Sequence, residues 1–200
     1  MTHCGTLRVH LFVERTRALG PFERAALWLQ GCNRRCKGCM SPATRPLSGG
    51  AVVETEQVLR RILAIKGVEG VTISGGEPFL QAEELAHLCG ALQNAGLGAI
   101  VYTGFTLEEL QAQNDPAVDA ALSSIDLLID GPFEQALAEN ALALRGSSNQ
   151  RVLPLTQRYV PVLEEVYGTA RHRVELQMVD GKLAAVGVPT PSMLRKMEQF

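Results

Sequence analysis

Three cysteines lie within eight residues of this sequence, at positions 32, 36 and 39. This spacing folds three thiolates around one face of an iron–sulfur cube and leaves the fourth iron without a protein ligand. A cube held by four cysteines mainly transfers electrons, whereas an open iron can bind and activate a small molecule. Cys32, Cys36 and Cys39 therefore indicate catalysis at a 4Fe-4S cluster.

A structural zinc site is the alternative, and it needs a fourth ligand such as a histidine. The candidates are distant, close to the N-terminus or inside a helical pattern: His3, Cys4, His10, His87 and Cys89. We interpret Cys4 and Cys89 as non-ligands, with Cys89 as a small apolar residue packed on its helix. A disulfide framework is disfavoured because five cysteines are an odd number and 200 residues can bury a core without one.

The composition is that of an ordinary globular protein. Of the 200 residues, 46% are hydrophobic and 20% are charged, which fits one compact domain. No apolar run reaches the roughly 20 residues that span a membrane, and the N-terminus lacks the pattern of a signal peptide. A net charge of -2 does not indicate the excess of basic residues that is typical of nucleic-acid-binding proteins. We therefore expect a cytoplasmic protein with reduced thiols that binds neither nucleic acid nor membrane.

The cysteines follow a predicted strand. Alternating apolar residues predict a strand over 7–13, and the more apolar segment 25–30 predicts a buried strand that runs directly into the cysteine loop. Prolines and glycines keep the next stretch irregular until Thr55, which we expect to cap a helix. The apolar positions of that helix share one face: Val58, Leu59, Ile62, Leu63 and Ile65.

The same rhythm continues along the chain. Strands are predicted over 70–74, 99–103 and 125–129, a helix over about 81–96, and another helix from the capping box at 106–109. Strands that alternate with helices form a parallel sheet covered by helices, and this chain is too short for a full eight-stranded barrel. We predict an α/β fold in the form of a partial, open (β/α)6-like barrel.

The pattern changes after residue 150. A helix is predicted near Pro161, and two short alternating segments, 174–178 and 183–188, flank an Asp-Gly turn that is typical of a hairpin. We therefore predict a barrel over 1–150 with one cluster. A helix and an antiparallel hairpin over 151–200 are expected to pack on the same domain.

A second motif, Ser-Gly-Gly-Glu-Pro at 74–78, follows the next predicted strand. Its two glycines let backbone approach a ligand closely, and its acidic side chain can accept hydrogen bonds from an ammonium group. Taken alone, the motif also fits a glycine turn before a helix. Functional groups of parallel α/β folds lie on loops at the carboxyl ends of strands, so the two motifs are expected at the same edge.

With both motifs in this order, the chain resembles the radical S-adenosylmethionine family, which carries CxxxCxxC after its first strand and a Gly-Gly-Glu-Pro-like motif after its second. The resemblance covers at least residues 20–150. It implies that the three cysteines hold a 4Fe-4S cluster and that S-adenosylmethionine chelates the open iron through its amine and carboxylate. The second motif then binds this cofactor through Gly75, Gly76, Glu77 and Pro78, of which the first three receive the amine.

Further segments resemble the activating enzymes of glycyl radical enzymes, in particular those of the anaerobic ribonucleotide reductase type. They are the Gly-Pro-x-x-Arg lead-in at 20–24, Gly38 before Cys39, the Thr-Gly-aromatic loop at 102–105, Asp-Gly-x-Phe at 130–133 and Arg-Gly-Ser-Ser-Asn-Gln at 145–150. The lead-in departs from the family at Phe22, where glycine is common. The cofactor contacts implied in these segments are Thr103, Gly104, Asp130, Ser147, Ser148 and Asn149. From the residues alone, Asp130 also fits a strand-end cap and 145–150 a polar turn. Met40 fits either the adenine pocket or plain packing.

Such an activating enzyme uses one electron from the reduced cluster to cleave S-adenosylmethionine to methionine and a 5'-deoxyadenosyl radical, which takes a hydrogen atom from a glycine of a partner protein. The resemblance thus implies a glycyl radical enzyme as partner and a flavodoxin- or ferredoxin-type electron donor. Arg34, Arg35 and Lys37 either receive that acidic donor or form a solvated surface. Two other functions stay open, namely a radical enzyme acting on a small molecule or ribosomal peptide, and a non-enzymatic iron–sulfur or zinc module.

Overall fold

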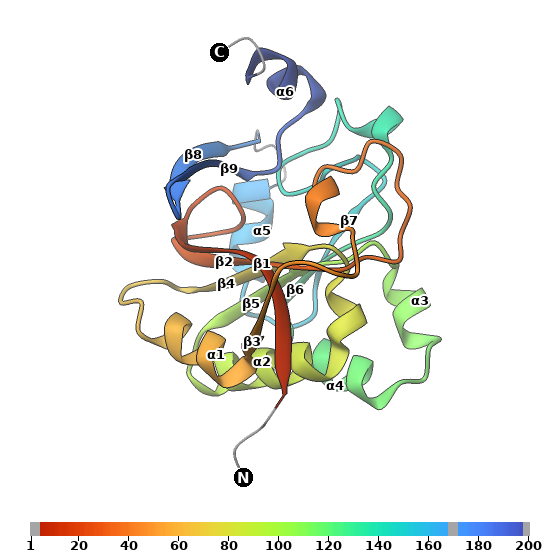
Figure 1. The fold of residues 1–200 in the computed structure, drawn as a ribbon. Coiled ribbons are helices and arrows are strands. Elements are labelled where there is room, and N and C mark those ends of the chain that lie inside the picture. The colour runs from red at the N-terminus through yellow and green to blue at the C-terminus, as the bar shows by residue number, and fades with distance from the viewer. Residues whose placement is uncertain (1–4, 168–171, 198–200) are drawn as a thin grey trace.

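The computed structural model describes residues 5–167 and 172–197, and its centre is a seven-stranded mixed sheet (Figure 1). The strands follow the order β3-β1-β2-β4-β5-β6-β7 across the sheet. Their bounds are β1 Thr6–Thr16, β2 Arg24–Leu29, β3 Ala51–Glu54, β4 Gly70–Gly75, β5 Gly98–Tyr102, β6 Leu127–Asp130 and β7 Arg151–Pro154. The helices are α1 Thr55–Leu63, α2 Ala82–Asn94, α3 Leu107–Gln111, α4 Pro116–Ser124, α5 Val160–Tyr167 and α6 Pro191–Met197. Short 3-10 turns are η1 Pro42–Thr44, η2 Pro78–Gln81 and η3 Gln135–Leu137.

Four neighbouring strands, β2, β4, β5 and β6, are parallel, and helices connect them in sequence as predicted. The remaining strands β1, β3 and β7 pair antiparallel, whereas the sequence rhythm predicted a parallel sheet throughout. The segment 17–23 between β1 and β2 explains one difference, because a parallel pair needs a crossover of about a dozen residues or more. The fold is therefore a mixed α/β arrangement with a parallel centre.

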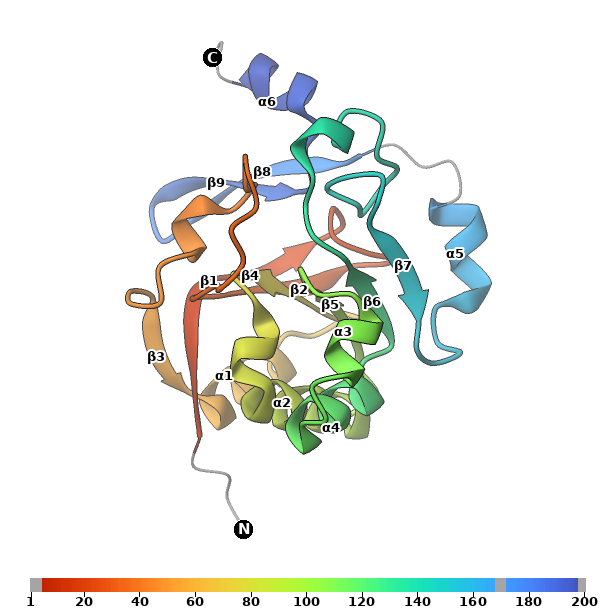
Figure 2. The same cartoon turned by 90° about the vertical axis from the view of Figure 1, so that its right-hand side faces the viewer.

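Side chains alternate between the two faces of the parallel strands. On one face Leu27, Ile73, Val101 and Leu128 are buried, and they belong to the largest core cluster together with apolar residues of α1, α2 and α4. Figure 2 shows these three helices on one side of the sheet. The apolar face predicted for the second helix is confirmed, since Leu85, Leu88, Cys89 and Leu92 of α2 are fully buried.

The opposite face of the sheet is covered by the C-terminal part of the chain. Ile100 and Ile129 lie in one core cluster with Leu144 and Tyr159. Ala26 of β2 lies in another cluster with Val186 and Val188, which come from the C-terminal hairpin and the residue after it. Residues beyond 153 therefore help to build the face of the sheet that adjoins the cysteine loop.

The predicted hairpin is confirmed as β8 (Val174–Val179) and β9 (Lys182–Gly187), joined by Asp180 and Gly181. Both turn residues have positive φ, 49° and 73°, as a two-residue hairpin turn of this hand requires. One face of the hairpin packs on the end of β1 and the start of the β1–β2 connection, where Glu175 accepts hydrogen bonds from the Thr16 hydroxyl at 2.7 Å and from the Arg17 backbone amide at 3.0 Å. The other face exposes Leu176, Met178 and Leu183.

The lead-in motif at 20–24 supports the amino-terminal edge of the parallel strands, away from the cysteines. The fully buried Arg24 guanidinium donates to the backbone oxygens of Pro21 and Val71 and to the Tyr159 hydroxyl, at 2.9, 3.2 and 3.1 Å. It also pairs with Glu69 at 3.2 Å. Every one of these partners is held at the base of the sheet, so Arg24 joins its strands to the segment that begins α5.

Phe22, within the same motif, has a φ of 61° and is 58% exposed. This is the left-handed backbone region that favours glycine, because a Cβ atom there approaches the following carbonyl oxygen. Phe22 thus has a backbone conformation that suits the glycine common at this position, although it carries a bulky side chain.

Several elements differ from the sequence predictions. Thr55 is the first residue of α1 instead of its cap, and its hydroxyl donates to Glu84. The short strands β3 and β7 and the helices α4 and α6 were not predicted. None of the helices in the described ranges is long and apolar enough to cross a membrane.

Candidate functional site at the carboxyl edge of the sheet

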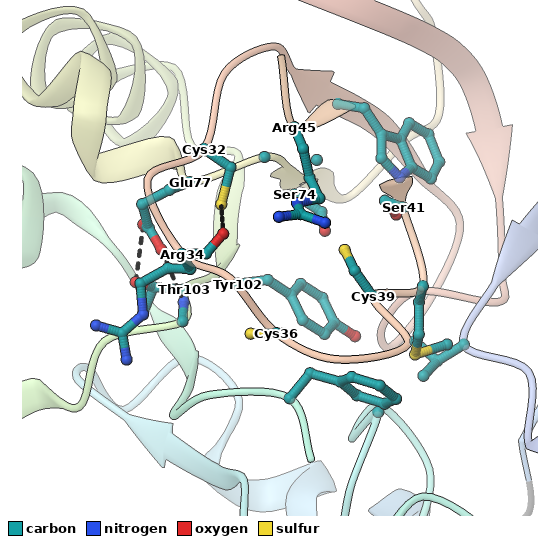
Figure 3. Close-up of a pocket in the computed structure, with 18 of the residues that line it drawn as sticks. Cys32, Arg34, Cys36, Cys39, Ser41, Arg45, Ser74, Glu77, Tyr102 and Thr103 are labelled. Atoms are coloured by element: carbon teal, nitrogen blue, oxygen red, sulfur yellow. Dashed lines mark hydrogen bonds between the residues drawn. The ribbon is translucent and has the colours of Figure 1, made fainter. Parts of the chain in front are cut away.

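A pocket opens at the carboxyl ends of the parallel strands and brings together most of the predicted site residues (Figure 3). The three cysteines line it from the loop after β2. Gly75, Gly76 and Glu77 line it from the end of β4, and Thr103 and Gly104 from the loop after β5. These loops meet because parallel strands present their carboxyl ends at the same edge.

The cysteine loop is fastened to the segment that follows it. The backbone amides of Gly31 and Cys32 donate to the carbonyl oxygens of Thr44 and Arg45, at 2.8 and 3.0 Å. The side-chain amide of Gln30, the residue after β2, donates to two further carbonyl oxygens of that segment, at 3.2 and 2.8 Å. The loop therefore closes on itself and holds its thiols at the pocket instead of extending into solvent.

Cys32, Cys36 and Cys39 are free, half-buried thiols, and Figure 3 shows their sulfur atoms around one common space. Burial raises the pKa of the Cys32 thiol, and the neighbouring thiols and Glu77 raise it further. Such a thiol gives up its proton when a metal ligates the sulfur. The residues present thus fit a cube that takes one thiolate on each of three irons.

Within residues 5–167 and 172–197, no group of three or more His, Cys, Asp or Glu side chains is arranged to hold a single metal ion. The fourth zinc ligands considered from the sequence that lie inside these ranges are placed elsewhere. The ring of His10 hydrogen-bonds to Gln30, and that of His87 to Glu56. Cys89 lies on the buried face of α2, where burial raises the pKa of its thiol to about 12. His3 and Cys4 lie outside the described residues.

The glycines of the second motif permit close packing of two loops. Gly75 has a φ of 111°, and a Cβ there would lie 2.3 Å from the carbonyl oxygen of Leu29. A Cβ on Gly76 would lie 2.0 Å from the carbonyl oxygen of Gly31. Any side chain at these two positions would push the end of β4 away from the cysteine loop.

Glu77 is fully buried and ties the loop after β5 to the end of β4. Its carboxyl oxygens accept from the Thr103 hydroxyl at 2.9 Å, the Gly104 amide at 2.8 Å and the Phe79 amide at 3.1 Å. Burial raises the pKa of this carboxyl to about 7, against the lowering by these donors and by the charge of Arg34. A carboxylate has about four acceptor sites, so one remains for a ligand.

Five predicted cofactor-binding residues do not line the pocket: Pro78, Asp130, Ser147, Ser148 and Asn149. Pro78 is buried at the start of η2. Asp130 accepts from the backbone amide of Leu107 at the start of α3, at 2.8 Å, and from Arg151 of β7, at 2.9 Å. It thereby acts as an anchor between elements, the interpretation that the residue type alone also allowed.

The segment 145–150 holds the loop after β6 in place by hydrogen bonds. Ser147 accepts from the Glu134 amide at 3.0 Å, and the Asn149 amide donates to the carbonyl oxygen of Pro132 at 2.8 Å. Ser148 is exposed. Gln150 accepts from the Gly146 amide at 2.7 Å and donates to the Gly131 carbonyl oxygen at 2.9 Å.

Some pocket residues were not singled out as site residues from the sequence. They are Leu19, Trp28, Ser41, Arg45, Ser74, Tyr102, Gly131, Phe133, Gly146, Gln150, Gly187 and Val188. Tyr102, Gly131, Phe133, Gly146 and Gln150 lie inside motifs that the resemblance named, so their order in the sequence was a usable signal. For Arg45, Gly187 and Val188 the sequence contained no such signal. Met40 lines the pocket and packs against the core cluster beside it.

The basic side chains of the cysteine loop differ in their surroundings. Arg34 lies over the Phe105 ring, 4.6 Å from its centroid, and 3.9 Å from Glu109. Arg35 and Lys37 are exposed. Of the three, only the latter two therefore present their charge fully to solvent.

Comparison with known proteins places the chain in a family. The family of the 4Fe-4S single cluster domain matches residues 18–153. The anaerobic ribonucleoside-triphosphate reductase-activating protein of Salmonella typhimurium is 32% identical over 155 residues, which cover 73% of this chain and 97% of that protein.

Two more similarities are shorter. The pyruvate formate-lyase-activating enzyme of Clostridium pasteurianum is 32% identical over 101 residues, or 48% of this chain and 42% of that enzyme. The crystal structure of QueE from Escherichia coli matches with a TM-score of 0.38 and 18% identity, over 52% of this chain and 54% of that one.

The predicted resemblance is confirmed, and with it the two cofactors that it implies, a 4Fe-4S cluster and S-adenosylmethionine. The chain belongs to the 4Fe-4S single cluster domain family, among the radical S-adenosylmethionine activating proteins of glycyl radical enzymes.

Proposed function

We propose that this protein activates an anaerobic ribonucleotide reductase or a similar glycyl radical enzyme. The observation that carries the proposal is the meeting of three free thiols and the Gly-Gly-Glu motif in one pocket. When bound, the reduced cluster supplies the electron that cleaves S-adenosylmethionine to methionine and a 5'-deoxyadenosyl radical, which takes a hydrogen atom from a glycine of the partner.

The protein's own residues bind and orient the reactants. Cys32, Cys36 and Cys39 hold three irons, and the backbone of Gly75 and Gly76 admits the amine of S-adenosylmethionine. The remaining acceptor site of Glu77 accepts one hydrogen bond from the amine. This assignment agrees with the lining of the pocket, which includes all six of these residues.

Residues behind the pocket act as positioning residues. Ser147 and Asn149 fix the loop after β6 by the hydrogen bonds described above, and this loop brings Phe133 to the pocket. Asp130 holds the end of β6, where this loop begins, to the start of α3 and to β7. We propose that they affect binding of the nucleoside through this loop. A catalytic acid or base is not required of them, because the cofactor performs the bond cleavage.

The architecture and the wider setting follow the same proposal. We infer that the sheet is a partial radical S-adenosylmethionine barrel, which the sequence placed over 1–150 and which β7 extends to Pro154. The rest of 151–200 is inferred to be an addition packed on it, and the protein to be cytoplasmic. A flavodoxin- or ferredoxin-type donor is proposed to reduce the cluster, with Arg35 and Lys37 as its docking charges. An open edge of the barrel admits a peptide loop of the partner enzyme.

The test is anaerobic incubation of the reconstituted protein with a candidate glycyl radical enzyme, reductant and S-adenosylmethionine. We expect a glycyl radical doublet in the electron paramagnetic resonance spectrum, absent when the partner's target glycine is replaced by alanine. Cleavage of S-adenosylmethionine without a radical on any such partner would instead support a small-molecule or peptide substrate.

A further inference from the structure

Arg45 is built into the wall of the pocket. Its carbonyl oxygen accepts from the Cys32 amide at 3.0 Å, and the preceding Thr44 accepts from the Gly31 amide at 2.8 Å. Thr44 is itself buried, and its hydroxyl donates to Ser41 at 2.7 Å. The backbone of Arg45 is therefore held beside the first cysteine.

The Arg45 guanidinium points into the pocket between Cys32 and Cys39, close to Ser74 in the view of Figure 3. Within residues 5–167 and 172–197, no side chain or carbonyl group pairs with it. Arg34, the other cation of the pocket lining, is already engaged by Phe105 and Glu109.

An arginine keeps its charge at all ordinary pH values and presents a planar fork of donors that matches a carboxylate. S-adenosylmethionine carries a sulfonium, an amine and one carboxylate, so the carboxylate is its one negatively charged group and the strongest partner for a guanidinium. The amine and the carboxylate are attached to the same carbon atom, so they bind close together. A cation beside acceptors for the amine is thus the arrangement that binds both groups, and Arg45 lines the same pocket as Ser74 and Glu77.

We propose that Arg45 binds the methionyl carboxylate of S-adenosylmethionine. This proposal rests on the proposed function, because it takes S-adenosylmethionine to be the ligand of the pocket. The competing role is charge compensation of the thiolate-bound cluster, which would change the reduction potential of the cluster without distinguishing ligands by their carboxylate.

The experiment compares two probes, S-adenosylmethionine and its decarboxylated analogue. Their dissociation constants are measured by calorimetry on anaerobically reconstituted protein with an oxidised cluster, so that no cleavage occurs. The variants are Arg45→Met, Arg45→Lys and the control Arg60→Met, an exposed arginine of α1 on the helix-covered side of the sheet. Iron content and cluster reduction potential are recorded for each.

A hydrogen-bonded charge pair contributes enough that Arg45→Met should weaken S-adenosylmethionine binding about tenfold or more. Binding of the decarboxylated analogue should change less than about twofold, and Arg45→Lys should retain part of the difference. The control should bind both probes as the wild type does.

Equal weakening of both probes, or unchanged binding of S-adenosylmethionine, would overturn the proposal. A shifted reduction potential with unchanged discrimination would assign Arg45 to the cluster instead. Should Arg45→Met lose iron, the same comparison on Arg45→Lys decides the question. Failure of the proposed function would look different: a wild-type protein that activates no glycyl radical enzyme but acts on another substrate would still bind S-adenosylmethionine and show the same Arg45 dependence, and a wild-type protein that does not use S-adenosylmethionine would bind neither probe.

Discussion

Replacement of Glu77 by glutamine tests how the pocket is held together, because this carboxyl is fully buried and its pKa is raised by burial to about 7. The folded protein then binds a proton more tightly at this site than the unfolded chain, whose carboxyl has the ordinary value of 4.5. Stability therefore falls as pH rises through this window, because ionisation is penalised only in the folded state. Glutamine stays neutral and escapes this dependence.

The size of the effect follows from the shift. The full displacement from 4.5 to about 7 corresponds to about 3 kcal/mol, most of which develops between pH 5 and pH 8. The free energy of unfolding of the wild type, minus that of Glu77→Gln, should decrease by roughly this amount over that range. Taking the difference cancels the titration of all other groups.

The assay is urea unfolding of the cluster-free protein at pH 5, 6, 7 and 8, followed by circular dichroism. The exposed Glu83→Gln, in the first turn of α2, is the matched control. A difference that is independent of pH, or one that increases towards pH 8, would refute the reasoning. It would mean that the three donors around Glu77 outweigh its burial and stabilise the carboxylate.

Three further predictions concern stability and reactivity. Arg24→Met should lower the free energy of unfolding by about 3 kcal/mol, because it breaks a buried charge network, while iron per folded molecule stays unchanged; urea titration and iron analysis check both. Phe22→Gly should raise the melting temperature, because relief of the left-handed backbone is worth about 1 kcal/mol, and an unchanged or lower value would count against strain there. In a Cys4→Ser background, a thiol reagent at pH 8 should modify the three cluster thiols of the cluster-free protein and reach Cys89 only after unfolding, since burial raises the pKa of Cys89 to about 12.

Periodicity and turn chemistry were sufficient to predict the parallel centre of the fold. The strands around 70–74 and 99–103, the buried face of α2 and the Asp-Gly turn of the hairpin all depend on local sequence. The capping box of Thr106 and Glu109 is present with both of its hydrogen bonds. Because parallel strands end at one edge, the convergence of the two motifs was predictable as well.

The misses have physical causes. β3 and β7 have four residues each and little burial, so their sequences show no clear alternation. α4 begins with Asp115 as its cap and Pro116 at its first turn, a local signal that was present but not used. The antiparallel pairing of β1 depends on the length of a connection, which a strand-by-strand pattern does not reveal.

In the site, the sequence predicted which segments meet better than it predicted which atoms face the pocket. Asp130, Ser147 and Asn149 belong to the expected loops, yet their side chains bond to backbone behind the pocket. Arg45 and Val188 reach the pocket through tertiary packing alone, and such contacts leave no periodic trace in the sequence.

The central claim is that three thiols of one pocket hold a cluster that cleaves S-adenosylmethionine. The most direct measurement is the amount of 5'-deoxyadenosine formed per protein under anaerobic reduction, for the wild type and for single serine replacements of Cys32, Cys36 and Cys39. We predict product with the wild type and none above background with each variant. Undiminished product from any of the three variants would contradict the account.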